Sequence, residues 1–243
     1  MSELDLRFIG TGNAFAPNGL CWNGFVANGK YLFEAPPQAL QMLNALGLDA
    51  NGLDAVVLSH HHGDHFLGLP FLMLEWKYSK RRRPVRIIGP AGTRKLAEQI
   101  ALSVYPGVLQ TTHEIEWEEL GPAARTRAGD LELETLGMKH DERLSGTLGF
   151  AAMLGGRRFG YTGDTAMCDS VIALAKHSTV LVSECASRAD DVDVHMKLVK
   201  DMPVRRAAMH EDAQLVLTHL GEGVDDGGLK NTLVARDGES YRF

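Results

Sequence analysis

The feature that most limits what this chain can fold into is the run His-His-His-Gly-Asp-His at positions 60–65, which follows a mostly apolar run at 54–59. It offers four potential metal ligands in one short segment: His60, His62, Asp64 and His65. Because an extended backbone sends alternate side chains to the same side, His60, His62 and Asp64 can converge while His65 turns to a neighbouring position. Imidazole mixed with carboxylate is typical of a catalytic metal site, whereas a closed structural site usually relies on cysteine. The segment therefore predicts a metal centre with room for two ions.

Matching ligands follow three other β-like runs of the chain. The run 131–136 leads toward His140, the run 158–163 leads to Asp164, and the run 215–218 leads to His219. In α/β architectures, functional sites lie where strand-ending loops converge at the carboxyl edge of the sheet. One such residue alone would be an ordinary loop residue, and a His-rich surface turn is the plain alternative for 60–65. Four strand ends that carry His or Asp argue for one shared site instead.

In order and spacing, these residues resemble the motifs of the metallo-β-lactamase superfamily, and the resemblance runs nearly end to end. Within the superfamily the chain is most similar to the ribonuclease Z and phosphodiesterase branch. That branch opens with a segment like 8–15 and follows its Asp-His with a Gly-Leu-Pro, as at 68–70. The resemblance implies an αββα sandwich with metals at one edge of two facing sheets, where composition and periodicity alone would give only mixed α and β.

The resemblance also implies a role for each ligand. One metal would be held by His60, His62 and His140, the other by Asp64, His65 and His219, with Asp164 as the bridge. Two ions roughly 3.5–4 Å apart can share a water, lower its pKa and clamp the attacking and leaving oxygens of a displacement, so the expected nucleophile is hydroxide. We expect two divalent ions, with zinc as the first choice and manganese or iron as alternatives, because the same ligands accept all three.

Two further residues match the branch in order, Glu184 after a strand and His195 beyond it. With Asp64 they complete the candidate catalytic residues. A phosphodiester's leaving alkoxide needs a proton, and a His oriented by a carboxylate can supply one near neutral pH. The plain alternative is that Glu184 caps or pairs with a helix and His195 merely begins one. A thioester or lactone substrate would need this pair less.

Three hydrolytic functions therefore stay open. The first is a phosphodiesterase that uses a metal-bridged hydroxide on a small or nucleotide-like diester. The second is 3′ processing of transfer RNA, and the third is hydrolysis of a lactone or thioester. The net charge of -6 gives no basic field for a polyanion, and the long substrate-gripping arm of ribonuclease Z has no obvious counterpart, so both features count against RNA. A non-catalytic metal-binding module is disfavoured by the complete ligand set.

Some positions near the ligands carry separate expectations. Glu34 stands where the branch usually has Asp, and its extra methylene is expected to reshape the loop behind the site. His61 should point away from its neighbours, and Gly63 should allow a tight turn. The basic run 80–83 is interpreted as a solvated loop, with contact to a substrate phosphate as the alternative.

The chain of 243 residues, 44% hydrophobic, can bury a core as a single domain, 1–243, whose two similar halves meet near residue 125. Strands are expected at 4–9 and 24–33, the second broken by a hairpin turn at Asn28-Gly29. Helices are expected at 38–46, 66–78 and 93–104, and one more is expected to begin at Pro203. Part of the apolar surface of 66–78 suits a second subunit equally well, so a homodimer stays open.

Three cysteines without a close pair indicate neither a disulfide framework nor a cysteine zinc site. The first seven residues are unlike a signal peptide. The most apolar segment, 66–76, is too short to cross a bilayer. We therefore expect a cytoplasmic protein that has no membrane partner.

Overall fold

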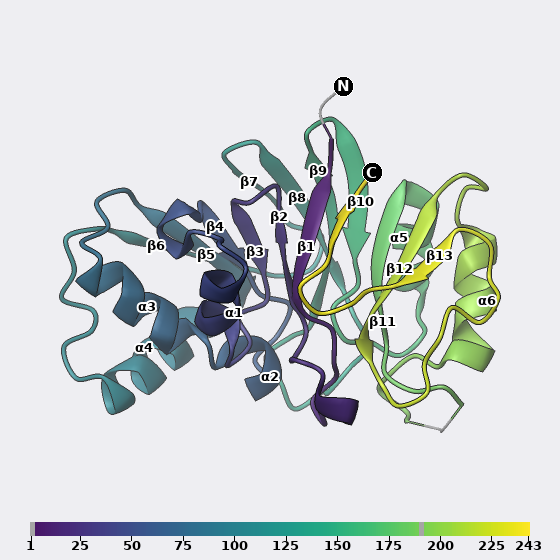
Figure 1. Cartoon of the computed structure of the whole chain (residues 1–243), viewed down its shortest axis with the longest axis horizontal. Coiled ribbons are helices and arrows are strands. Elements are labelled where there is room, and N and C mark those ends of the chain that lie inside the picture. Colours follow the sequence, from purple (N-terminus) through teal and green to yellow (C-terminus); the bar gives the residue numbers. More distant parts are fainter. Residues whose placement is uncertain (1–2, 190–191) are drawn as a thin grey trace.

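The computed structural model describes residues 3–189 and 192–243, in which two mixed β-sheets pack face to face (Figure 1). Each sheet has seven strands, and helices lie against the outer faces. These layers form the αββα sandwich that the sequence predicted. Among the described residues, every helix is too short or too polar to span a bilayer.

The first sheet has the strand order β14-β1-β2-β3-β4-β5-β6. Its strands are β1 (Asp5–Gly10), β2 (Gly24–Ala27), β3 (Tyr31–Phe33), β4 (Ala55–Val57), β5 (Val85–Pro90), β6 (Ile115–Leu120) and β14 (Ser240–Arg242). β2 and β3 form the expected hairpin, in which Asn28 and Gly29 have φ values of 47° and 69°, as a type I′ turn requires. β3 to β6 run parallel, so their carboxyl ends meet at one edge.

The second sheet has the order β13-β12-β11-β10-β9-β8-β7. Its strands are β7 (Arg125–Ala128), β8 (Leu131–Gly137), β9 (Leu148–Leu154), β10 (Arg157–Tyr161), β11 (Val180–Cys185), β12 (Gln214–Leu220) and β13 (Thr232–Val234). β7 to β10 form an antiparallel meander, and β10 to β13 run parallel. The chain crosses between the sheets after β6, close to the point where two halves are expected to meet. That these halves form one domain stays a prediction.

Near its carboxyl end the chain returns to the first sheet, where β14 pairs antiparallel with β1. Just before β14, the Asp237 carboxylate accepts hydrogen bonds from the Thr11 hydroxyl and the Cys21 amide, both at 2.7 Å. The segment that follows β1 is therefore held in place by residues far away in the sequence.

The helices divide between the two outer faces (Figure 1). Those beside the first sheet are α1 (Ala39–Ala45), α2 (Gly63–Phe66), α3 (Leu69–Tyr78) and α4 (Thr93–Val104), and those beside the second are α5 (Asp169–His177) and α6 (Leu198–Ala208). Two single 3-10 turns occur at Pro17–Gly19 and Ala50–Gly52.

Strand residues alternate between two kinds of core. Ala55 and Val57 face the space between the sheets, whereas Val56 packs with the helices that cover the outer face. Because both faces of a central strand are buried, its sequence is continuously apolar. Aromatic rings fill the space between the sheets; the ring centroids of Phe25 and Phe33 are 4.8 Å apart, and that of Phe159 is 5.6 Å from Phe33. These rings belong to the core that holds the two sheets together.

The expected helix over 66–78 is confirmed for 69–78, but it is not continuous, because α2 ends at Phe66 and α3 starts at Leu69. Gly68 lies between them and approaches the backbone so closely that an added Cβ would come within 2.1 Å of the Pro36 oxygen. The expectation that a helix begins at Pro203 is also wrong. α6 begins at Leu198, where the Asp201 carboxylate accepts a hydrogen bond from the Lys197 amide at 2.8 Å, and Pro203 lies inside the helix.

Candidate metal centre

The seven predicted ligands come from five segments of the chain and meet at one edge of both sheets. His60 and His62 follow β4, Asp64 and His65 belong to α2, His140 follows β8, Asp164 follows β10, and His219 lies in β12. They form two groups in which the nearest ligand atoms all lie within 4.8 Å of one another: His60, His62, His140 and Asp164, and Asp64, His65 and His219. A further group of this kind joins Asp164 and His219 to His195, so the assignment of each ligand to one of two metals stays a prediction.

The local backbone differs from the expected extended run. Only His60 and His62 precede the helix, whereas Asp64 and His65 project from the single turn of α2. The expected tight turn at Gly63 is wrong, since Gly63 begins this helix and is not among the residues with positive φ. His61 does point away from the cluster, and its Nε2 lies 2.8 Å from the Thr93 hydroxyl.

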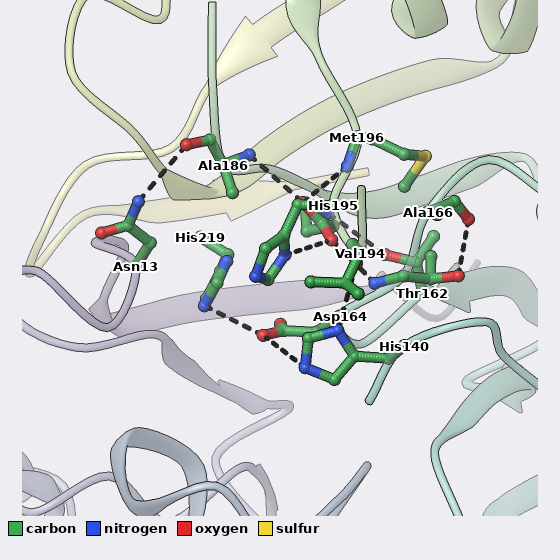
Figure 2. Close-up of polar contacts among 12 residues, drawn as sticks. Asn13, His140, Thr162, Asp164, Ala166, Ala186, Val194, His195, Met196 and His219 are labelled. Atoms are coloured by element: carbon green, nitrogen blue, oxygen red, sulfur yellow. Dashed lines mark hydrogen bonds and ion pairs between the residues drawn. The ribbon is translucent and has the colours of Figure 1, made fainter. Parts of the chain in front are cut away.

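Asp164 occupies the centre of the cluster. Its Oδ2 atom lies 3.8 Å from His60 Nε2 and 3.9 Å from His140 Nε2 in the first group. The same atom lies 3.4 Å from His65 Nε2 and 3.2 Å from His219 Nε2 in the second. Figure 2 shows Asp164 between the rings of His140 and His219. A carboxylate that faces both groups has the geometry of a bridging ligand.

Several polar atoms of the cluster are buried and have no hydrogen-bond partner among the described residues: His60 Nε2, Asp64 Oδ2, His65 Nε2, Asp164 Oδ1 and His219 Nε2. Buried polar groups are nearly always paired, and each unpaired one costs about 1–3 kcal/mol. Imidazole nitrogens and carboxylate oxygens that converge without partners form a donor set for a divalent cation. The residues present therefore fit the metals that the sequence implies.

Three of the five clustered imidazoles also present their other ring nitrogen to an oxygen. These pairs are His60 Nδ1 with Ser59 Oγ at 2.8 Å, His140 Nδ1 with Val194 O at 3.1 Å, and His62 Nε2 with Asp141 Oδ2 at 3.4 Å. In a fourth, His65 Nδ1 lies 3.6 Å from Glu34 Oε1, too far for a hydrogen bond. Metal-binding His residues typically have such a partner, which orients the ring and fixes its tautomer. No sequence pattern indicates these partners, although Ser59 and Asp141 are direct neighbours of ligands.

The charge states of His60 and Asp164 suit metal binding. Burial, and then the nearby His65, lower the pKa of His60 well below its usual value, so its imidazole is neutral and keeps a free lone pair. Burial alone would raise the pKa of Asp164, but His219 and His65 hold it well below the usual range, so the carboxylate stays ionised.

Glu34 lies behind the cluster in a buried network that joins the two sheets. The Tyr161 hydroxyl donates to Glu34 Oε1 and accepts from Asn23 Nδ2, both at 2.9 Å, and Thr218 Oγ1 donates to Asn23 Oδ1 at 2.6 Å. The Ser59 amide also donates to Glu34, at 3.3 Å. We call Glu34, Tyr161, Asn23 and Thr218 the inter-sheet network.

The backbone of Glu34 is left-handed, with φ of 64°. A non-glycine residue in this conformation is uncommon and strained by about 1–3 kcal/mol. The contacts of its carboxylate offset that strain. The Glu at this position therefore places its carboxylate between His65 in one layer and Tyr161 in the opposite sheet.

Glu184 pairs with His195, which lies beside the cluster (Figure 2). Glu184 lies within β11, its Oε1 is 2.9 Å from His195 Nδ1, and its carboxylate accepts from the amides of Thr165, Ala186 and Met196 at 2.7, 3.1 and 3.3 Å. The His195 ring centroid lies 4.9 Å from that of His140 and 5.4 Å from that of His219. Burial lowers the pKa of His195, but the Glu184 carboxylate more than compensates and raises it to about 9. Glu184 thus orients His195 toward the cluster, and the helix-capping alternative does not describe it.

A cavity of about 880 Å³ opens over the cluster. Apart from the clustered residues, the charged side chains that line it are Lys139, Arg143, Asp141, Glu142, Asp193 and Glu222. Arg143 is already paired with Asp141, with Nη2 to Oδ2 at 2.7 Å. The rim of the cavity is therefore mainly acidic.

The basic run 80–83 is not among the described residues that line this cavity. Arg81 is buried and donates to the carbonyl oxygens of four residues: Asn51, Leu53, Arg83 and Pro84. The interpretation of 80–83 as a solvated loop is therefore wrong for Arg81, which ties the loop to the segment before β4.

The family of the chain follows from comparison with known proteins. Residues 29–220 match the model of the beta-lactamase superfamily domain, and the chain belongs to this superfamily. Ribonuclease Z of Thermococcus kodakarensis is 27% identical over 144 residues, which cover 56% of this chain and 43% of that protein. Ribonuclease Z of Mycobacterium bovis is 26% identical over 251 residues, covering 92% and 88%. The match thus spans less than half of the first relative and most of the second.

Solved structures agree with the fold. The metallo-beta-lactamase fold protein YhfI from Bacillus subtilis superimposes with a TM-score of 0.80 at 21% identity, covering all of both chains. A diphosphatase from the PhnP family gives a TM-score of 0.78 at 16% identity, covering 99% of this chain and 98% of that one. At these identities the likeness concerns the fold alone. The chain thus has the metallo-β-lactamase fold, carries a cluster of His and Asp residues that could hold a metal, and is related to ribonuclease Z.

Proposed function

We propose that the protein is a metal-dependent phosphodiesterase that acts on a small or nucleotide-like diester. The observation that carries this proposal is the Glu184–His195 pair, whose imidazole lies beside the metal-ligand cluster. A proton donor at this place favours a substrate whose leaving group needs a proton, such as a phosphodiester, over one whose leaving group does not.

In this proposal one divalent ion is held by His60, His62 and His140, and a second by Asp64, His65 and His219, with Asp164 between them. The grouping of the ligand atoms and the unpaired buried nitrogens and oxygens support this assignment. When bound, such a pair supplies Lewis acidity and an activated water for an in-line displacement. Zinc is the first choice because imidazole and carboxylate ligands suit it, and manganese or iron are alternatives.

His195 acts as the proton donor. Its Nδ1 faces Glu184 Oε1, so Nε2 is left to hold a proton for the leaving oxygen. Three backbone amides fix the Glu184 carboxylate, and this carboxylate fixes the ring in turn. Glu184 is therefore a positioning residue, and it also favours the protonated form that a general acid requires.

Processing of transfer RNA is the second candidate, because relatives that match much of the chain are named ribonuclease Z. The charge of the cavity argues against it. Proteins hold polyanions chiefly through Lys and Arg contacts to phosphates. Here two cations face four carboxylates on the rim: Lys139 and Arg143, and Asp141, Glu142, Asp193 and Glu222. Such a rim suits a substrate with a single phosphodiester charge.

The test is a side-by-side assay of the metal-loaded protein on a bis-aryl phosphate, cyclic nucleotides, precursor transfer RNA and lactones. We expect hydrolysis of the small diesters at the highest kcat/KM. Preferred cleavage of precursor transfer RNA would establish the second candidate. Robust lactone hydrolysis without diester cleavage would establish a carboxylic ester hydrolase and overturn the proposal.

A further inference from the structure

Phe15 is an aromatic side chain on the rim of the cavity over the cluster. It is 91% exposed, the largest exposure among the large apolar side chains of the described residues. Among the described residues that line this cavity, it is the one Phe, Tyr or Trp. A single exposed apolar residue is ordinary on a protein surface. Its place at the mouth of a metal-ligand cluster makes Phe15 different.

The loop that carries Phe15 is fixed on both sides of the ring. Asn13 Oδ1 accepts from the Phe15 amide at 3.0 Å. Asn13 Nδ2 donates to the Ala186 carbonyl at 3.3 Å (Figure 2). Trp22 Nε1 donates to the Ala14 carbonyl at 3.1 Å. Ala16, directly after Phe15, has φ of 47°, a left-handed conformation that costs energy for a residue with a Cβ. A strained, anchored loop thus presents the ring to solvent, where it gains nothing from burial.

The anchors also connect this loop to the chemistry. Ala186, which accepts from Asn13, donates its amide to the Glu184 carboxylate at 3.1 Å. The Asn13 amide donates to the Leu220 carbonyl at 3.1 Å, one residue after the ligand His219. The position of Phe15 is therefore set by the same strands that place His195 and His219.

We propose that Phe15 determines substrate specificity by stacking on a planar aromatic group of the diester, either a nucleobase or an aryl substituent. The inference rests on the proposed phosphodiesterase function and names its substrate class. When two rings stack, the face of each ring that meets the other is removed from water. No base-specific hydrogen bond is needed, so an aromatic side chain can stack on any planar ring. It also supplies affinity without a cation, which matters at a mainly acidic rim.

Binding of the product-like ligands adenosine 5′-monophosphate and ribose 5-phosphate tests the inference without catalysis. Calorimetry is carried out on the metal-loaded protein and on Phe15→Ala, Phe15→Leu and Phe15→Trp. Loss of one stacked base weakens binding by about 5- to 150-fold. We expect Phe15→Ala and Phe15→Leu to lose this much affinity for adenosine 5′-monophosphate and to bind ribose 5-phosphate unchanged. Phe15→Trp should bind the adenosine ligand as tightly as the wild-type protein does. Phe71→Ala, a change at a 43% exposed ring on α3, is the matched control and should change neither.

A second pair of ligands, phenyl phosphate and methyl phosphate, separates the two sources of the aromatic group. If only the affinity for phenyl phosphate depends on Phe15, the aromatic group is an aryl substituent. If the affinity for adenosine 5′-monophosphate depends on Phe15, the aromatic group is a nucleobase. Equal affinity of the wild-type protein for ligands with and without a ring would overturn the inference. So would a Phe15→Ala protein that binds the ring-bearing ligands normally. These binding results test the role of Phe15 and leave the proposed function open. The proposed function is tested separately by the assay of diester hydrolysis.

Discussion

Replacing Tyr161 by phenylalanine removes one hydroxyl from the inter-sheet network and nothing else. This hydroxyl donates to Glu34 and accepts from Asn23, so two buried groups lose a partner. An unpaired buried polar group costs about 1–3 kcal/mol. Glu34 keeps the Ser59 amide, so its share lies near the low end of that range. We therefore expect Tyr161→Phe to lower the free energy of unfolding by about 2–4 kcal/mol.

Tyr31→Phe is the matched control. Tyr31 is equally buried between the sheets, but its hydroxyl contacts Asp130, which is exposed. Water can replace that bond, so the expected loss is about 0.5–1.5 kcal/mol. Urea unfolding of both variants, with metal removed by chelator, measures the two values without a contribution from ligand binding. An equal fall in the free energy of unfolding for the two variants would refute the argument that water cannot replace the hydrogen bonds of the inter-sheet network.

Three further predictions concern the metals and the proton donor. Elemental analysis of metal-supplemented protein should give about two transition-metal ions per chain, and a value near zero would contradict the proposed site. Asp164→Ala should abolish hydrolysis while circular dichroism shows a folded protein, because this carboxylate lies between the ligand groups and outside the hydrophobic core; an active variant would mean that another residue bridges. His195→Ala should slow diesters with poor leaving groups by about 10²–10⁴ and barely affect nitrophenyl diesters. Ligand atoms of His195, Asp164 and His219 also lie within 4.8 Å of one another. Loss of metal in this variant would therefore identify His195 as a metal ligand instead of a proton donor.

The ligand cluster could be predicted because the signal for each ligand is local. Each lies in a β-like run or in the short segment that follows one, and the fold brings those segments to one edge. The inter-sheet network has no such signal, because Tyr161 meets partners 127 and 138 residues away in the sequence. Nothing near Tyr161 or Asn23 in the sequence distinguishes them from ordinary residues of a strand and a loop.

Errors in the predicted helices have the same origin. The apolar pattern over 66–78 is continuous, and the break at Gly68 arises from its contact with the backbone of Pro36, across a long stretch of chain. Arg81 resembles its basic neighbours in sequence, and only the carbonyl groups of a distant segment make it a buried residue. Tertiary contacts therefore override local patterns at these positions.

The pairing of β14 with β1 constrains the order in which the protein folds. The hydrogen bond from Thr11 to Asp237 joins residues 226 positions apart, and contacts of such separation form slowly because a long loop must close first. During synthesis, the ligands after β4 and on α2 emerge long before Asp237 does. We therefore expect the segment after β1, which leads into the loop that carries Phe15, to take its final position late, so that a nascent chain presents its first metal-binding residues before the mouth of its cavity takes shape.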